Sequence, residues 1–206
     1  MKIGVLALQG AFIEHIKILR DLGVEAVEVR LPADLQGLDG LIIPGGESTT
    51  IGKLAEIYGL MEPLRAFAVE KPVWGTCAGM IFMAKEIGQD QPLLGFMDIV
   101  VERNAFGRQV DSFETDLDVS VFENGSGAGH PFPAVFIRAP RLIDARGETE
   151  ILSRLDDGTA VAAQEGRWLV TAFHPELTGD DRFHRYFLQI VEQNISGEGA
   201  NITGLK

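Results

Sequence analysis

The sequence contains a single cysteine, Cys77, and this scarcity excludes an internal disulfide and fits a reducing compartment. Positive charge is also scarce, because 18 Lys and Arg face 30 Asp and Glu, giving a formal net charge of −12. That excess argues against nucleic acid and against an anionic membrane surface as partners. One cysteine and four unclustered histidines predict no metal site. No apolar run is long enough to span a bilayer, so we expect a cytoplasmic location.

The first third of the chain alternates between strand-like and helix-like segments. An apolar run at 2–8 is followed by apolar residues at helical spacing over 11–22, and further strand-like runs cover 25–29 and 38–43. This order predicts a βαβ unit and therefore a parallel sheet. We expect the next helix to begin near Ser48 or Thr49, either of which is a suitable N-cap residue.

The remainder of the chain has a different hydrophobic pattern. Its predicted strands are partly alternating and rich in β-branched or aromatic residues, which indicates antiparallel or mixed pairing. The Gly- and Pro-rich stretch 123–133 predicts a mobile surface loop, in which His130 is incidental. His184 falls among the polar positions of the last helix and receives no role. The predicted strands are 94–103, 112–122, 134–138, 151–155, 159–164 and 168–173, and the last helix lies within 179–194.

The cysteine lies in Gly75-Thr76-Cys77-Ala78-Gly79, between a strand-like run at 72–74 and an apolar helical segment at 78–85. A Gly-x-Cys-x-Gly pattern in this setting is the thiol form of the nucleophile elbow, a sharp strand-to-helix turn. Flanking glycines let neighbouring backbones approach closely, and the helix N-terminus favours thiolate over thiol. A lone cysteine is often only a small buried apolar side chain. This setting favours a nucleophile instead, with the N–H of Ala78 as an oxyanion donor.

Two further motifs each follow a predicted strand. The loop from Pro44 to Thr50 contains paired glycines whose backbone N–H groups are suited to an anion, so it predicts the second oxyanion donor. In His174-Pro175-Glu176, the histidine is a candidate base and acid, and the carboxylate is placed to orient the imidazole. Ligand sites in such sheets gather at the carboxyl ends of the strands, so we expect these motifs to converge on Cys77. A cysteine–histidine pair of this kind suits acyl transfer from an amide through a thioester.

The elbow and His174-Pro175-Glu176 together resemble the class I, or triad, glutamine amidotransferases. Other segments narrow the match to the family of glutaminase subunits of pyridoxal 5′-phosphate synthase, and the resemblance extends to about Gln193. These segments are Leu6 to Phe12 with Glu14-His15, Pro44 to Thr50, Arg103-Asn104 to Gln109 with Ser112-Phe113-Glu114, and Phe136 to Pro140.

The resemblance implies a flavodoxin-like α/β fold, a three-layer sandwich whose central, mostly parallel sheet carries helices on both faces. It implies one amidotransferase domain over 1–194, whereas the mostly polar, Gly-containing composition of 195–206 predicts a flexible tail. The implied reaction is hydrolysis of L-glutamine to L-glutamate and ammonia, without a cofactor in this subunit. The ammonia would pass to a (βα)8-barrel synthase subunit, and glutaminase subunits would decorate a ring of these barrels to make pyridoxal 5′-phosphate.

The resemblance also assigns the site residues. It implies a catalytic triad of Cys77, His174 and Glu176, with oxyanion donors at the backbone N–H groups of Gly46 and Ala78. The implied contacts to L-glutamine are Gly46, Glu47, Ser48, Arg103, Ile137 and Arg138.

Three alternatives stay open at the level of sequence. The chain is also compatible with the glutaminase subunit of another amidotransferase. A stand-alone cysteine hydrolase is disfavoured by the loop after Pro44 and by the separated His-x-Glu motif. A glutaminase-like regulatory module without catalysis is disfavoured by the complete set of Cys77, His174 and Glu176. We further expect Gln9, at the end of the first strand, to lie beside the Gly45-Gly46 loop and to face the synthase.

Overall fold

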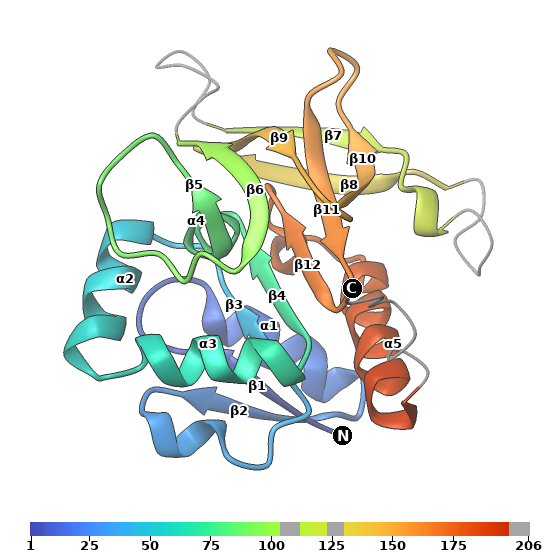
Figure 1. Ribbon diagram of the computed structural model, residues 1–206. Helices are drawn as coiled ribbons and strands as arrows, with labels where there is room; N and C mark the ends of the chain where they lie inside the picture. The colour runs from blue at the N-terminus through green and yellow to red at the C-terminus, as the bar shows by residue number, and fades with distance from the viewer. Residues whose placement is uncertain (104–111, 123–129, 198–206) are drawn as a thin grey trace.

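Strands and helices alternate through the first part of the chain in the computed structural model, which describes residues 1–103, 112–122 and 130–197 (Figure 1). These elements are β1 (Lys2–Leu6), α1 (Phe12–Asp21), β2 (Glu25–Val29), η1 (Pro32–Leu35), β3 (Gly40–Ile43), α2 (Ser48–Ile57), α3 (Met61–Glu70), β4 (Val73–Thr76), α4 (Ala78–Met83) and β5 (Ala84–Glu86). Strands then dominate, as β6 (Met97–Glu102), β7 (Ser112–Leu117), η2 (Ser120–Phe122), β8 (Phe132–Ile137), β9 (Arg141–Ala145), β10 (Glu150–Arg154), β11 (Ala160–Glu165) and β12 (Trp168–Thr171), followed by η3 (Pro175–Leu177) and α5 (Arg182–Ser196).

The large sheet has the strand order β2-β1-β3-β4-β12-β11-β9-β6-β5, with β10 paired to β11. Strands β2, β1, β3, β4 and β12 pair in parallel, and antiparallel pairing begins between β12 and β11. Strands β7 and β8 form a separate antiparallel pair, at the top of the view in Figure 1. The predicted α/β fold with a mostly parallel sheet is confirmed, and so is the change to antiparallel strands in the second half.

Helices cover both faces of the parallel strands. On one face, the Trp74 ring of β4 packs against His15 of α1 and Phe183 and Phe187 of α5. On the other face, α4 lies directly over β4, where a side chain at Gly75 would meet the backbone of Gly79. Because successive strand residues point to opposite faces, the large Trp74 and the small Gly75 leave room for both layers.

Four local predictions were wrong. The strand expected over 112–122 ends at Leu117, and residues 120–122 form η2 instead. The N-cap of α2 is Glu47, whose carboxylate accepts hydrogen bonds from the backbone N–H groups of Thr49 and Thr50. The helix after the elbow ends at Met83, because Ala84 is extended and begins β5, which pairs in parallel with β6. His184 is completely buried, since it lies between Trp74 and α1 and not on the solvent face of α5.

Some expectations fall outside the described residues. These are the segment 104–111, most of the loop at 123–133, and the tail from 198 onward. The last helix continues to Ser196, two residues beyond the domain limit that we expected at 194.

We predict that Gly79→Ala destabilises the protein. A Cβ at Gly79 would lie 2.1 Å from the carbonyl oxygen of Ile43, a backbone atom that cannot move without shifting β3. Overpacking of this kind typically costs about 1–3 kcal/mol, so the free energy of unfolding in urea should fall by that amount or more.

Gly179→Ala is the matched control, because Gly179 has no atom within 4 Å of the added methyl group and no positive φ. Equal unfolding free energies for the two variants would contradict close packing at the elbow.

Candidate active site

The candidate site lies where neighbouring parallel strands end. Thr76 at the end of β4 pairs with Thr171 at the end of β12, and Ile43 at the end of β3 pairs with Gly75. The residues that follow each strand therefore emerge at one edge of the sheet. As predicted, this brings together Cys77 after β4, the glycine loop after β3, and His174 after β12.

Cys77 occupies a strained turn between β4 and α4. Its backbone has φ 48° and ψ −102°, and its N–H donates to the carbonyl of Thr171 at 2.8 Å. The Cys77 residue is 94% shielded from solvent, and its sulfur lies 3.9 Å from the carbonyl oxygen of Ile137, the last residue of β8. Arg138, which follows, also has a positive φ, of 43°. Strained non-glycine residues of this kind cluster at functional sites, so the turns at Cys77 and Arg138 mark this edge as one.

His174 and Glu176 form a buried pair beside the thiol. Nδ1 of His174 lies 2.7 Å from Oε1 of Glu176, and both residues are more than 90% buried. Burial lowers the pKa of His174, but hydrogen bonds to Cys77 and Glu176 and their negative charges outweigh it and raise the pKa to about 10. The site therefore favours an imidazolium between sulfur and carboxylate.

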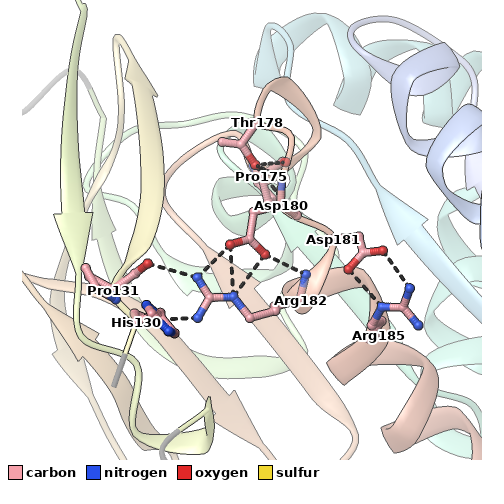
Figure 2. A network of polar contacts seen from close by, with 8 residues as sticks. All are labelled: His130, Pro131, Pro175, Thr178, Asp180, Asp181, Arg182 and Arg185. Carbon is pink, nitrogen blue, oxygen red and sulfur yellow. Dashed lines mark hydrogen bonds and ion pairs between the residues drawn. The ribbon is translucent and has the colours of Figure 1, made fainter. Parts of the chain in front are cut away.

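The segment that carries Glu176 is held by the salt-bridge network shown in Figure 2. Arg182 at the start of α5 pairs with the carboxylate of Asp180 and donates to the carbonyl oxygens of His130 and Pro131, which precede β8. The N–H of His174 also donates to the carbonyl of Val135 in β8, at 2.8 Å. The imidazole, the carboxylate and β8 are thus fixed to one another.

The glycine loop after β3 approaches the thiol and the imidazole very closely. A Cβ at Gly45 would lie 2.3 Å from Cε1 of His174 and 3.3 Å from Cβ of Cys77. The loop is tied to the segment between β1 and α1, because Ala11 N–H donates to the Gly45 carbonyl and Glu47 N–H donates to Oε1 of Gln9, at 2.6 Å. The predicted position of Gln9 beside this loop is confirmed.

A second polar cluster surrounds Arg103. Its guanidinium donates to Oε1 of Glu47, Oγ1 of Thr49 and Oε1 of Gln91, at 2.9, 3.0 and 2.7 Å. Oγ of the buried Ser48 donates to the same Gln91 oxygen at 3.3 Å. Burial raises the pKa of Glu47, but hydrogen bonds from Thr50 and Thr49 outweigh it and lower the pKa to about 2, so this carboxylate stays charged.

The predicted site residues therefore form two groups that share one loop. Cys77, His174, Glu176 and Ile137 lie together. Glu47 and Ser48, which continue the Gly45-Gly46 turn, lie in a second group with Arg103, which follows β6. Ala78 is the first residue of α4, directly after the thiol. Sequence reasoning missed Gln91, because a glutamine in a polar loop carries no motif. It also missed His184, whose helical position suggested exposure.

A thiol on a sharp turn beside a buried imidazole–carboxylate pair is the arrangement of cysteine enzymes that transfer acyl groups. Within the described parts of the chain, no group of three or more His, Cys, Asp or Glu side chains is placed to hold a metal ion. The fold and the site thus define the class of cysteine-dependent acyl transferases and hydrolases on an α/β sheet.

Comparison with known proteins is consistent with that class and narrows it. Residues 5–193 match the model of the SNO glutamine amidotransferase family, and the chain belongs to that family. It is 60% identical to pyridoxal 5′-phosphate synthase subunit PdxT of Herpetosiphon aurantiacus over 193 residues, covering 91% of this chain and 99% of the relative. It is 58% identical to the PdxT subunit of Dehalococcoides mccartyi strain BAV1, covering 93% and 98%.

Solved structures agree. A crystal structure of a glutamine amidotransferase superposes with a TM-score of 0.85 at 49% identity, covering 92% of this chain and 98% of that one. The structure of PurLQS from Thermotoga maritima shares the fold alone, at 16% identity and a TM-score of 0.65, covering 96% and 98%. Among the described residues, none of the helices combines the length and apolar character that a membrane span needs.

We predict that the His174 ring titrates near pH 10 and that Cys77→Ala lowers this midpoint, because the substitution removes the sulfur that stabilises the imidazolium. NMR of the ring nitrogens across pH 5–11 measures both midpoints. An unchanged midpoint in Cys77→Ala would contradict the contact between the two side chains.

The raised pKa of His174 also makes the stability of the protein depend on pH. Its contribution to the free energy of unfolding is complete below the ordinary histidine pKa of 6.5 and is lost as the pH rises toward about 10. The loss should be smaller in Cys77→Ala, which urea unfolding at pH 6 and pH 9 measures.

Proposed function

We propose that this protein is the glutaminase subunit of a pyridoxal 5′-phosphate synthase, hydrolysing L-glutamine to L-glutamate and ammonia. The observation that supports this most directly is the convergence of Cys77, His174 and Glu176 at one sheet edge, in a chain of the glutamine amidotransferase family. The synthesis of pyridoxal 5′-phosphate is proposed from the relatives, which are named as subunits of pyridoxal 5′-phosphate synthase.

In the proposed reaction, Sγ of Cys77 attacks the carboxamide carbon of glutamine. The tetrahedral oxyanion would be stabilised by the backbone N–H groups of Gly46, which follows the Gly45 packed against Cys77, and of Ala78, the residue after Cys77. His174 gives its proton to the departing nitrogen, so ammonia leaves and a thioester to Cys77 remains. A water molecule, deprotonated by His174, then hydrolyses the thioester to glutamate. Glu176 holds the imidazole in the tautomer and orientation that both steps need.

The second polar cluster is suited to the amino-acid end of the substrate. Arg103 offers a guanidinium for the α-carboxylate, and Glu47 a carboxylate for the α-ammonium group. Ser48 and the backbone of Ile137 and Arg138 complete the proposed contacts. The guanidinium currently pairs with Glu47, so glutamine would replace one ion pair by two.

The ammonia requires an acceptor, and the proposed acceptor is the (βα)8-barrel synthase subunit. We propose a hetero-oligomer in which glutaminase subunits decorate a ring of such barrels. Docking would place the site edge against the barrel, because Gln9, Gly10 and the glycine loop all lie there. Exposed Ile13 on α1, next to this edge, adds apolar surface for such a contact.

Cys77→Ala should abolish ammonia and glutamate release from glutamine, because no other side chain in the site supplies a nucleophile of this kind. The assay pairs the protein with the synthase subunit from the same genome and follows glutamate formation and transfer of 15N from labelled glutamine to pyridoxal 5′-phosphate. Cys77→Ala should retain binding to the synthase in size-exclusion chromatography.

Free ammonium supplied to the Cys77→Ala complex is the internal control, since it should restore product formation. Glutamate release by Cys77→Ala at the wild-type rate would overturn the proposed role of the thiol. A wild-type complex that transfers no 15N would overturn the proposed pathway.

We predict that Gln9→Ala lowers glutamine turnover in the complex, by roughly 10- to 100-fold, because Oε1 of Gln9 holds Glu47 N–H beside the proposed oxyanion donor Gly46. The measurement is kcat for glutamate release with the synthase present. Gln36→Ala is the matched control, since Gln36 is exposed in a turn before β3. Equal turnover in the two variants would contradict the proposed role of Gln9 in holding the loop at Gly46.

A further inference from the structure

Two histidines beneath the site take no part in the reaction described above. His15 of α1 and His184 of α5 are both completely buried and pack edge-on against the ring of Trp74. Nδ1 of His15 lies 2.9 Å from Nε2 of His184, within hydrogen-bonding distance. Burying two imidazoles in an apolar layer is costly unless their nitrogens are paired, so the arrangement requires an explanation.

The pair extends the line of polar atoms that begins at the thiol. Oε1 of Glu176 is hydrogen-bonded to Nδ1 of His174. The other carboxylate oxygen, Oε2, is buried and has no hydrogen-bond partner among the described residues. Nε2 of His15 faces that oxygen at 3.4 Å, slightly beyond hydrogen-bond length. Hydrogen bonds of catalytic groups are often long in the substrate-free state and shorten during reaction.

The positions of the ring protons follow from the contacts. If His15 carries its proton on Nε2, it faces the carboxylate as a donor, and its bare Nδ1 accepts from Nε2–H of His184. If His15 carries its proton on Nδ1, a lone pair faces the carboxylate and His184 must carry its proton on Nδ1. That nitrogen is buried and has no partner in the described structure. Since an unpaired N–H costs more than a bare ring nitrogen in a buried site, the first arrangement prevails.

His15 also remains uncharged. Burial, and to a smaller extent the proximity of His184 and His174, hold the pKa of His15 well below its usual range. Burial likewise lowers the pKa of His184 to about 4, against the opposing charge of Asp181. A neutral donor holds the carboxylate without competing, as a second cation would, with the imidazolium at His174.

We propose that His15 is a positioning residue for the glutaminase reaction: its Nε2–H holds Oε2 of Glu176, and His184 fixes the tautomer that makes this donor available. The inference rests on the proposed function. With a hydrogen bond to each of its oxygens, the Glu176 carboxylate cannot rotate away from His174. The imidazole therefore keeps its orientation toward Cys77 during both proton transfers.

A purely structural role for His15 makes different predictions. Thr76 Oγ1 lies 3.5 Å from Nε2 of His15, so the ring also has a hydroxyl neighbour within the core. If His15 only filled space there, its replacement by a ring of similar size would change stability and leave turnover per folded molecule unchanged. Measuring kcat therefore distinguishes a positioning role of His15, which lowers kcat when lost, from a purely structural role, which does not.

The test compares His15→Phe, His15→Gln and His130→Phe in complex with the synthase. Phenylalanine keeps the ring and removes the donor, so kcat should fall roughly 10- to 100-fold, part of what general acid–base catalysis supplies. KM for glutamine should stay within about twofold, since the proposed substrate contacts lie elsewhere. The amide nitrogen of glutamine reaches the position of Nε2, so His15→Gln should recover most of kcat. His130→Phe makes the same exchange at an exposed histidine and keeps the backbone carbonyl that accepts from Arg182, so it should match the wild type.

Folded His15→Phe with wild-type kcat, or folded His15→Gln no better than His15→Phe, would overturn the proposal. Should His15→Phe fail to fold, 15N NMR of the wild-type histidine rings decides instead. His15 and His184 should both be neutral with the proton on Nε2, and a proton on Nδ1 of His15 would overturn the assignment. A wild-type complex that releases no glutamate would instead refute the proposed function, and the ring tautomers would still be read in that sample.

Discussion

The parallel pairing of β4 with β12 is the constraint on which the site depends. It sets Thr76 opposite Thr171, so the thiol and the imidazole leave neighbouring strands at nearly the same height. A shift of one residue in this register would turn every side chain of β12 to the other face of the sheet. Because both strands are buried, the hydrophobic packing that stabilises the fold also fixes the geometry of the chemistry.

Close approach of backbones is the second requirement. The loop after β3, the loop after β1 and the elbow are so close together that an added methyl group has no room. At Gly10, for example, an added Cβ would lie 1.8 Å from the Gly45 carbonyl oxygen. Such close packing restricts the motion of the reacting side chains. Polar side chains then pair backbone N–H groups that would otherwise be unpaired. Gln9 accepts from the N–H of Glu47, and Glu47 accepts from N–H groups in the first turn of α2.

Much of this arrangement was predictable from sequence, and the exceptions have physical causes. Apolar periodicity predicted the parallel strands, and the residue types at 77, 174 and 176 predicted the group at their ends. The short strand β9 was missed because Arg141–Ala145 alternates weakly and is stabilised by its neighbours. The N-cap at Glu47 was missed because a long carboxylate must fold back to reach two N–H groups. His184 was misplaced because helical spacing cannot show that a neighbouring histidine satisfies a buried one.

The clamp made by Arg182 has a consequence for local unfolding. Through it and the bond from His174 N–H to Val135, the hairpin of β7 and β8 is fastened to the turn that carries the imidazole and the carboxylate. Fraying of this hairpin would therefore release Ile137 from the sulfur and loosen His174 in the same event. Amide exchange in this small ribbon and the fraction of molecules ready to react are then two measures of a single equilibrium.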